Sequence, residues 1–139
     1  MEQLLQDSSG RVRLIFKDRP LAIHPGARAA HEAARCAGAQ GRYWEYHDRL
    51  FTGQPAFGHE DLLAYASALG LDRAAFARCV EERRFGPDVE ADVDQAVALG
   101  VFATPTLFVN GRRVEGLVSL EELRSIIENA LDAASKERR

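Results

Sequence analysis

The spacing of hydrophobic and polar residues changes along this chain and divides it into strand-like and helix-like stretches. Arg11 to Asp18 alternates apolar with charged side chains, which predicts a β-strand, and Ile15 on its polar side predicts cover on both faces. Between residues 26 and 99 the apolar positions recur at helical spacing. Alternation returns at Thr106–Val109 and Arg112–Glu115, which predicts two further strands.

Turn and capping residues divide the helical region into separate helices. Pro25 is expected at a first helical position, Asp72 is a suitable N-cap, and glycines close several of the helices. The expected helices are Ala27–Gln40, Tyr43–Phe51, Glu60–Leu69, Arg73–Glu82 and a further helix that opens at Pro87 and is closed by Gly100.

Two of these helices have distinctive faces. The first presents a smooth row of small side chains, which favours close packing against a neighbour: Ala30, Ala33, Ala34 and Ala37. The second places four larger side chains on one side: Trp44, His47, Leu50 and Phe51.

Local signals also define the two ends of the chain. Asn110-Gly111 is the strongest short hairpin signal in the sequence and joins the two predicted strands. Ser119 and Glu122 form a capping box at the start of an amphipathic final helix. At the other end, Leu4 and Leu5 lie in a stretch that resembles the last turns of a helix without its beginning.

Composition places the chain among globular proteins. Its 139 residues suit one domain, and 46% hydrophobic with 28% charged residues is ordinary for that class. The net charge of -3 gives no reason to expect nucleic acid or an anionic membrane as a partner. No apolar run approaches the roughly 20 residues of a membrane span. The first residues lack a secretory signal, so the chain as written would stay in the cytoplasm.

The sequence offers no cofactor or metal site. His24, His31, His47 and His59 do not have the spacing of metal ligands, and no glycine-rich phosphate loop is present. His47 is more readily explained as a packing residue with Trp44 and Asp48. We therefore expect neither a metal nor a cofactor.

The two cysteines, Cys36 and Cys79, are 43 positions apart and both fall inside predicted helices. A catalytic dithiol needs a thiolate at a helix N-terminus with its partner one turn away, which excludes this pair from catalysis. The pattern favours free buried thiols. A structural disulfide between two helices is the alternative.

Six segments, taken in order, resemble the DsbA-like thiol–disulfide oxidoreductases, a thioredoxin-fold family with a helical insertion. The segments are Val12–Pro25, Ala33–Ala37, Gln40–Phe51, Leu69–Asp72, Phe76–Cys79 and the run Gly100-Val-Phe-Ala-Thr-Pro-Thr-Leu-Phe-Val-Asn-Gly111. The resemblance implies an α/β fold in a single domain, residues 1–139. Residues 26–99 would be the helical insertion, and residues 11–18 and 101–134 the thioredoxin-like part.

The resemblance also implies a substrate site at Thr104 and Pro105. In the family the bond before this proline is cis, and the backbone before it pairs with an extended, thiol-bearing polypeptide. Without the family, Pro105 would be interpreted as a proline that starts a strand.

The chain departs from the family because it has no C-x-x-C. The family's first strand and the start of its dithiol helix are missing, which leaves three alternatives. These are truncation of the chain, donation of the strand by another copy in a homodimer, and direct pairing of the flanking strands. In each case we expect this chain alone to be inactive as a thiol–disulfide oxidoreductase.

A second class of function stays open. A non-catalytic binding or assembly module would use the cis-proline groove or an exposed strand edge to hold a peptide. A relative of the kappa glutathione transferases and isomerases is a weaker alternative.

Overall fold

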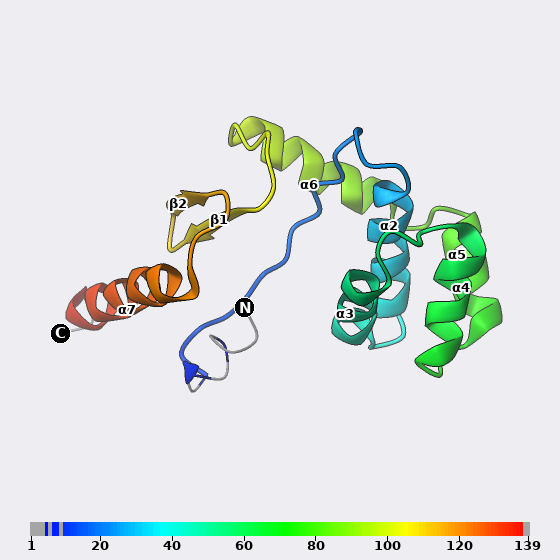
Figure 1. Cartoon of the computed structure of the whole chain (residues 1–139), viewed down its shortest axis with the longest axis horizontal. Helices are drawn as coiled ribbons and strands as arrows, with labels where there is room; N and C mark the ends of the chain where they lie inside the picture. Colours follow the sequence, from blue (N-terminus) through cyan, green and yellow to red (C-terminus); the bar gives the residue numbers. More distant parts are fainter. Residues whose placement is uncertain (1–4, 6, 9, 138–139) are drawn as a thin grey trace. The chain divides into compact units, whose positions relative to one another are not determined.

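The computed structural model of this chain describes residues 5, 7, 8 and 10–137. Its contacts divide the chain into two compact units (Figure 1). The helical unit is Asp18–Ala98, and the hairpin unit combines Met1–Lys17 with Leu99–Arg139. The helix end expected around Leu4 and Leu5 falls largely outside the described residues. The assignment of residues 26–99 as an insertion in one domain stays a prediction.

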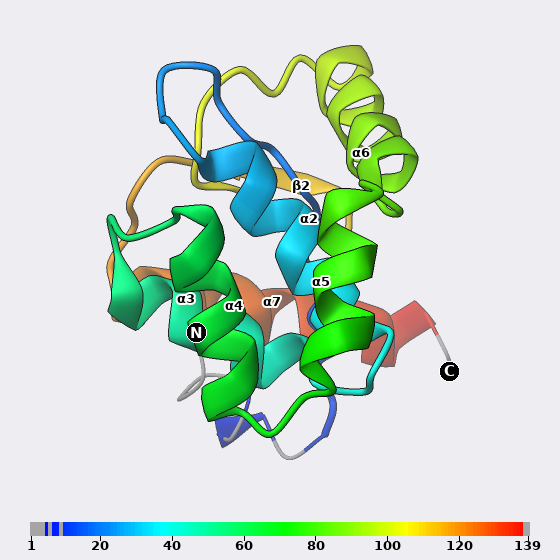
Figure 2. The same cartoon turned by 90° about the vertical axis from the view of Figure 1, so that its right-hand side faces the viewer.

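The helical unit contains five of the helices that the structure describes, at the positions where the hydrophobic spacing predicts helices. They are α2 (Ala27–Gly38), α3 (Tyr43–Gly53), α4 (His59–Ala68), α5 (Arg73–Glu81) and α6 (Gly86–Ala98). Figure 2 shows α2 to α5 gathered around a shared interior.

Helix α2 is central to this unit, because it packs against each of the other four helices. Its predicted alanine face is confirmed: Ala33 and Ala37 are fully buried, and Ala30 and Ala34 nearly so. Since alanine adds little bulk, the neighbouring helices can approach the backbone of α2 closely. The prediction that Pro25 starts this helix was wrong. Gly26 is the N-cap at φ 79°, a left-handed conformation that proline cannot adopt.

Helix α3 buries Leu50 of the predicted face, but not the aromatic residues of that face. Tyr46 and Leu50, four residues apart, are buried, whereas Trp44 and Phe51 are 43% and 61% exposed. The Tyr46 hydroxyl donates a hydrogen bond to the Leu62 carbonyl oxygen at 2.9 Å, so this buried polar group has a partner. Because its hydroxyl is hydrogen-bonded, Tyr46 can be buried in the interior of the helical unit without leaving a polar group unpaired.

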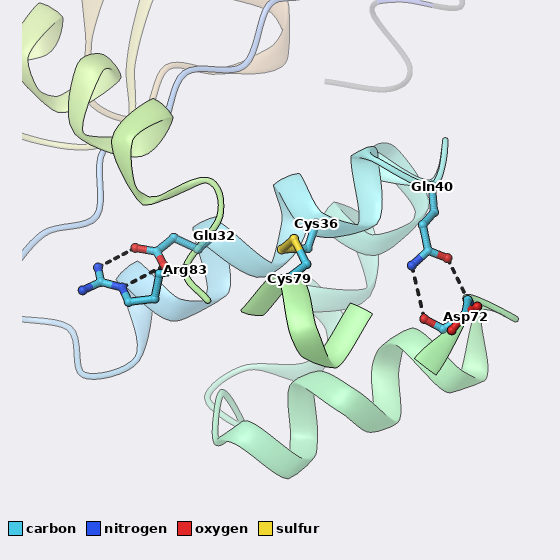
Figure 3. Close-up of a disulfide and its surroundings, with 6 residues drawn as sticks. All are labelled: Glu32, Cys36, Gln40, Asp72, Cys79 and Arg83. Atoms are coloured by element: carbon cyan, nitrogen blue, oxygen red, sulfur yellow. Dashed lines mark hydrogen bonds and ion pairs between the residues drawn. A yellow bond between two sulfur atoms is a disulfide. The ribbon is translucent and has the colours of Figure 1, made fainter. Parts of the chain in front are cut away.

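Helix α5 begins at the predicted cap. The Asp72 carboxylate accepts a hydrogen bond from the Ala75 backbone N–H at 2.9 Å. The Gln40 side chain, from the turn after α2, bonds both the Asp72 N–H at 2.8 Å and its carbonyl oxygen at 3.2 Å (Figure 3). The start of α5 is therefore fixed to the end of α2.

Asp72→Ala is expected to lower the free energy of unfolding by about 1 kcal/mol, because the Ala75 N–H loses its acceptor. Chemical denaturation followed by circular dichroism measures the change. Asp94→Ala, at an exposed position within α6, is the matched control and should change stability by less than about 0.5 kcal/mol. Equal effects of the two substitutions would contradict the capping role.

The hairpin unit contains an antiparallel pair of strands, β1 (Thr106–Val109) and β2 (Arg112–Glu115), followed by helix α7 (Leu120–Glu137). Asn110 and Gly111 both have positive φ, 47° and 85°, as a two-residue hairpin turn requires. The predicted hairpin is confirmed. Helix α7 packs against β1, and Ser119 Oγ accepts a hydrogen bond from the Glu122 N–H at 3.1 Å.

The predicted strand at residues 11–18 was wrong. The segment belongs to no sheet, and the described residues form a sheet of β1 and β2 alone. Its side chains do alternate, with Val12 and Leu14 half-buried between exposed Arg11 and Arg13. Alternation establishes which side chains turn inward, but a strand also needs a neighbour that accepts its backbone hydrogen bonds.

Candidate functional site

The loop between α6 and β1 is the predicted substrate-binding segment, and its surface is open. Phe102, Ala103, Thr104 and Pro105 are all exposed, and Phe102 is 69% exposed. The peptide bond between Thr104 and Pro105 is cis. The loop therefore presents both backbone and an aromatic side chain to its surroundings.

Hydrogen bonds hold this loop at both ends. At its start, the Arg113 guanidinium donates from Nη1 to the Leu99 carbonyl oxygen at 3.0 Å and from Nη2 to that of Gly100 at 2.7 Å. At its end, the Pro105 carbonyl oxygen accepts from the Gly116 N–H at 2.9 Å. These bonds fix the loop relative to the hairpin, which gives an exposed segment a defined shape.

A hydroxyl group shapes the middle of the loop. Thr106 Oγ1 donates to the Ala103 carbonyl oxygen at 2.7 Å, and so closes a short turn around Thr104 and Pro105. The backbone of this turn is therefore preorganised, a condition that favours binding of an extended chain.

The cysteines lie in the helical unit and form a disulfide, Cys36 to Cys79, which links α2 to α5 (Figure 3). Their Cα atoms are 5.9 Å apart, and the residues are 1% and 7% exposed. The preference for free thiols was wrong, and the alternative, a structural disulfide, is the arrangement found. Each cysteine sits on the buried face of its helix, which brings the two sulfur atoms together.

This disulfide lacks the features of a catalytic dithiol. Cys36 lies near the C-terminal end of α2 and Cys79 near that of α5, so neither sulfur gains from a helix N-terminus. Thiol–disulfide exchange requires a thiolate to reach a sulfur atom along the S–S axis, and both sulfurs are buried. The Cys36–Cys79 disulfide is therefore a structural cross-link between α2 and α5.

A buried ion cluster ties the beginning of the helical unit to α2 and α6. Asp18 Oδ2 accepts from Arg35 Nε at 2.5 Å, and Asp18 Oδ1 lies 2.7 Å from His31 Nδ1. Arg35 Nη2 donates to Asp92 Oδ2 at 2.6 Å, and the same oxygen accepts from the Asp18 N–H at 3.0 Å. Burial acts to lower the pKa of Arg35, but its hydrogen bond and charge interactions with the carboxylates outweigh burial and raise it.

The cluster also affects Tyr43, the first residue of α3. Burial raises the pKa of the Tyr43 hydroxyl, and the negative charge of Asp18 adds to the increase. No buried side-chain oxygen or nitrogen among the described residues lacks a hydrogen-bond partner. The cluster is thus fully satisfied, which is typical of a structural network.

Glu32, on α2, is a third buried carboxylate. It accepts hydrogen bonds from Arg83 Nε at 3.1 Å and Nη2 at 2.7 Å (Figure 3), and Arg28 Nε lies 3.3 Å away. The hydrogen bond from Arg83 lowers the pKa of Glu32 most. Burial opposes it, and the charges of Arg83 and Arg28 add to the lowering.

Because the pKa of Glu32 is lowered by folding, its contribution to stability is present above pH 4.5, its usual pKa. The contribution is lost as the pH falls through the lower folded value. Glu32→Gln is expected to remove part of the acid-induced loss of stability below pH 4.5. Urea unfolding at a series of pH values measures this. Glu60→Gln, at a largely exposed carboxylate, is the control and should keep the wild-type profile. Identical profiles for Glu32→Gln and wild type would contradict the role of Glu32.

Other candidate sites carry no clear chemistry. No group of three or more His, Cys, Asp or Glu side chains in the described part of the chain is arranged to hold a metal ion. Two shallow depressions of about 450 and 540 Å³ lie along α7. Neither is lined by Thr104, Pro105 or the cysteines.

With this geometry in view, comparison with known proteins identifies the family. The family model described as thioredoxin matches residues 1–129. The chain belongs to this thioredoxin family, and the match covers most of its length.

Three relatives share this region. The Na(+)/H(+) antiporter NhaA 1 of Salinispora arenicola is 40% identical over 131 residues, which cover 94% of this chain and 20% of that protein. NhaA 3 of Salinispora tropica is 39% identical over 135 residues, 96% of this chain and 21% of that protein. NhaA of Herminiimonas arsenicoxydans is 38% identical over 110 residues, 79% of this chain and 18% of that protein. The chain spans about a fifth of the length of these curated relatives.

None of the helices in the described part of the chain combines the length and apolar character needed to cross a bilayer. This statement covers α7, which has 18 residues and carries acidic side chains in its first turn.

The sequence interpretation missed the residues that organise these features. Arg113, whose guanidinium bonds the start of the loop, lies at an exposed position of β2. Nothing in the sequence around it indicated this role. Asp92 could have been noticed, because it lies three positions after Val89, on the buried face of the helix expected between Pro87 and Gly100. A carboxylate on such a face indicates a buried cation nearby, and here that cation is Arg35.

Proposed function

We propose that this chain is a DsbA-like member of the thioredoxin family that holds extended, thiol-bearing polypeptides and does not itself supply the redox couple. The observation that carries the proposal is the exposed, hydrogen-bonded loop at Thr104 and Pro105. Membership of the thioredoxin family supports thiol–disulfide exchange as the kind of reaction in which the bound polypeptides take part. The buried Cys36–Cys79 disulfide supports the absence of turnover by this chain alone.

The proposed binding step uses backbone rather than side-chain chemistry. A peptide in extended conformation would donate to and accept from the main chain beside Thr104, and Phe102 would supply apolar contact. Since no thiolate of this chain is exposed, affinity should not depend on the cysteine of the peptide. No metal or cofactor takes part.

Nuclear magnetic resonance of the labelled chain tests this proposal. A reduced, extended peptide with one cysteine is expected to shift the amide signals of Ala103, Thr104 and Thr106. The same peptide with serine in place of cysteine should bind within about twofold, and Thr106→Val, which removes the hydroxyl bond to Ala103, should weaken binding. Absence of binding, or shifts confined to the helical unit, would refute the proposal.

A second candidate function rests on the relatives, which are named as Na(+)/H(+) antiporters. In this alternative the chain acts as a thioredoxin-like module that works with such an antiporter. The test is sodium-dependent proton transport by vesicles that contain an antiporter encoded in the same genome, with and without added chain. A change in transport, absent when Thr106→Val replaces wild type, supports the alternative; unchanged transport rejects it.

A further inference from the structure

Helix α3 carries a continuous row of aromatic rings, here called the aromatic row: Tyr43, Trp44, His47 and Phe51. Tyr43 meets Trp44 edge-on, with ring centroids 5.2 Å apart. The rings of Trp44 and His47 are 5.3 Å apart, and those of His47 and Phe51 are 4.8 Å apart. Because each ring contacts the next, the row has a defined shape before any partner arrives.

Two rings of the aromatic row are exposed, although α3 has a separate buried face. Phe51 is 61% and Trp44 is 43% exposed, whereas Tyr46 and Leu50 fill the interior of the unit. Trp44 and Phe51 are two helical turns apart, about 10 Å along the axis. Connected aromatic side chains at a surface, with polar residues beside them, are typical of protein–protein contacts.

The aromatic row has an acidic border. Asp48 lies four residues after Trp44 and three before Phe51, so it shares their side of the helix. Its side chain is 74% exposed, and its Oδ1 lies 2.9 Å from His47 Nδ1, which holds the carboxylate beside the row. Glu45, 48% exposed, already pairs with Arg42. Asp48 is therefore the carboxylate best placed to receive a cation from a partner, and that cation can also lie over the Trp44 ring.

Charge distinguishes between the occupants that could cover this row. A second copy of the chain brings the same carboxylates, and like charges across an interface oppose association. The helical unit, Asp18–Ala98, has 13 acidic and nine basic residues, so an anionic membrane surface is repelled as well. A polypeptide with basic residues is attracted both by the unit and by the border of the row.

We propose that the aromatic row of α3 binds an amphipathic helix of another protein, whose apolar face is bordered by lysine or arginine. Apolar side chains of that helix, spaced by three or four residues, cover Trp44 and Phe51, and one of its cations pairs with Asp48. The surface shares no residue with the loop at Thr104 and Pro105. This interaction is therefore independent of peptide binding at that loop.

Fluorescence of Trp44, the only tryptophan in the sequence, reports directly on this surface. The probe is a synthetic helical peptide with a row of leucines bordered by lysines, and a second peptide has glutamates in place of the lysines. Trp44 emission of the full chain is expected to shift to shorter wavelength as the lysine peptide binds. The glutamate peptide should bind at least about tenfold more weakly, and Phe51→Ala should weaken the lysine peptide at least about fivefold.

Asp48→Lys tests the acidic border, and Glu60→Lys is its matched control. The two variants change the net charge equally, but Glu60 lies on α4, where its side chain is 83% exposed. Asp48→Lys should weaken the lysine peptide at least about tenfold and strengthen binding of the glutamate peptide. Glu60→Lys should keep both affinities within about twofold of wild type. Circular dichroism establishes that each variant retains its helices.

A Trp44 emission that does not respond to the lysine peptide would overturn the proposal. So would equal binding of the two peptides, or equal effects of Asp48→Lys and Glu60→Lys. A Trp44 shift that appears as the concentration of the chain alone rises would instead assign the row to a second copy. A shift with phosphatidylglycerol vesicles, in the absence of one with the lysine peptide, would assign it to a membrane surface.

Discussion

Replacement of both Cys36 and Cys79 by alanine is expected to lower the free energy of unfolding of the helical unit by about 4 kcal/mol. The disulfide joins residues 43 positions apart, and removal of so long a loop constraint frees many conformations of the unfolded chain. Alanine suits both buried positions because it leaves no unpaired polar group. Urea unfolding followed by circular dichroism measures the loss.

Chemical reduction provides the control for this prediction. A strong reductant should destabilise wild type by a similar amount, and it should leave the double variant unchanged, because that variant has no disulfide to reduce. A loss below about 1 kcal/mol, or an effect of the reductant on the double variant, would contradict a structural role for this bond.

Arg35→Met is expected to cost about 3–5 kcal/mol, because it leaves two buried carboxylates without their shared cation. The side chains of Asp18 and Asp92 are 2% and 8% exposed, and each lies within 2.6 Å of the Arg35 guanidinium. Methionine keeps much of the apolar stem of arginine, so the substitution tests mainly the charge and its hydrogen bonds. Thermal and urea unfolding measure the loss.

Arg28→Met is the matched control on the same helix. Arg28 is 41% exposed and pairs with Glu32 and Glu90, and its removal should cost less than about 1 kcal/mol. Addition of Asp92→Asn to Arg35→Met should recover part of the stability, since one uncompensated charge is removed. Similar losses for Arg28→Met and Arg35→Met, with no recovery, would contradict the buried cluster.

Local signals predicted most of the secondary structure. Asp72 caps α5, Asn110-Gly111 forms the hairpin turn, and the alanines of α2 face the core, because each depends on residues within a few positions of one another. On α3 the prediction included Leu50, which is buried, but it omitted buried Tyr46 and included Trp44 and Phe51, which are exposed. Helical period alone does not distinguish adjacent faces.

Contacts between residues far apart in the sequence could not be predicted from such local signals. The strand expected at residues 11–18 depends on a neighbouring strand, which alternation does not supply. The partner of Cys36 lies 43 positions away, and Arg35 joins carboxylates 17 and 57 positions distant. These pairings follow from the packing of α2 against α5 and α6, which only the fold reveals.

The central proposal is that this chain, a member of the thioredoxin family, does not itself supply a redox-active cysteine pair. Reduction of a model disulfide protein by excess dithiol, with and without catalytic amounts of this chain, tests that proposal most directly. We expect the rate with wild type to equal the uncatalysed rate, and the Cys36→Ala/Cys79→Ala variant to behave in the same way. Sustained turnover by either protein would contradict the account.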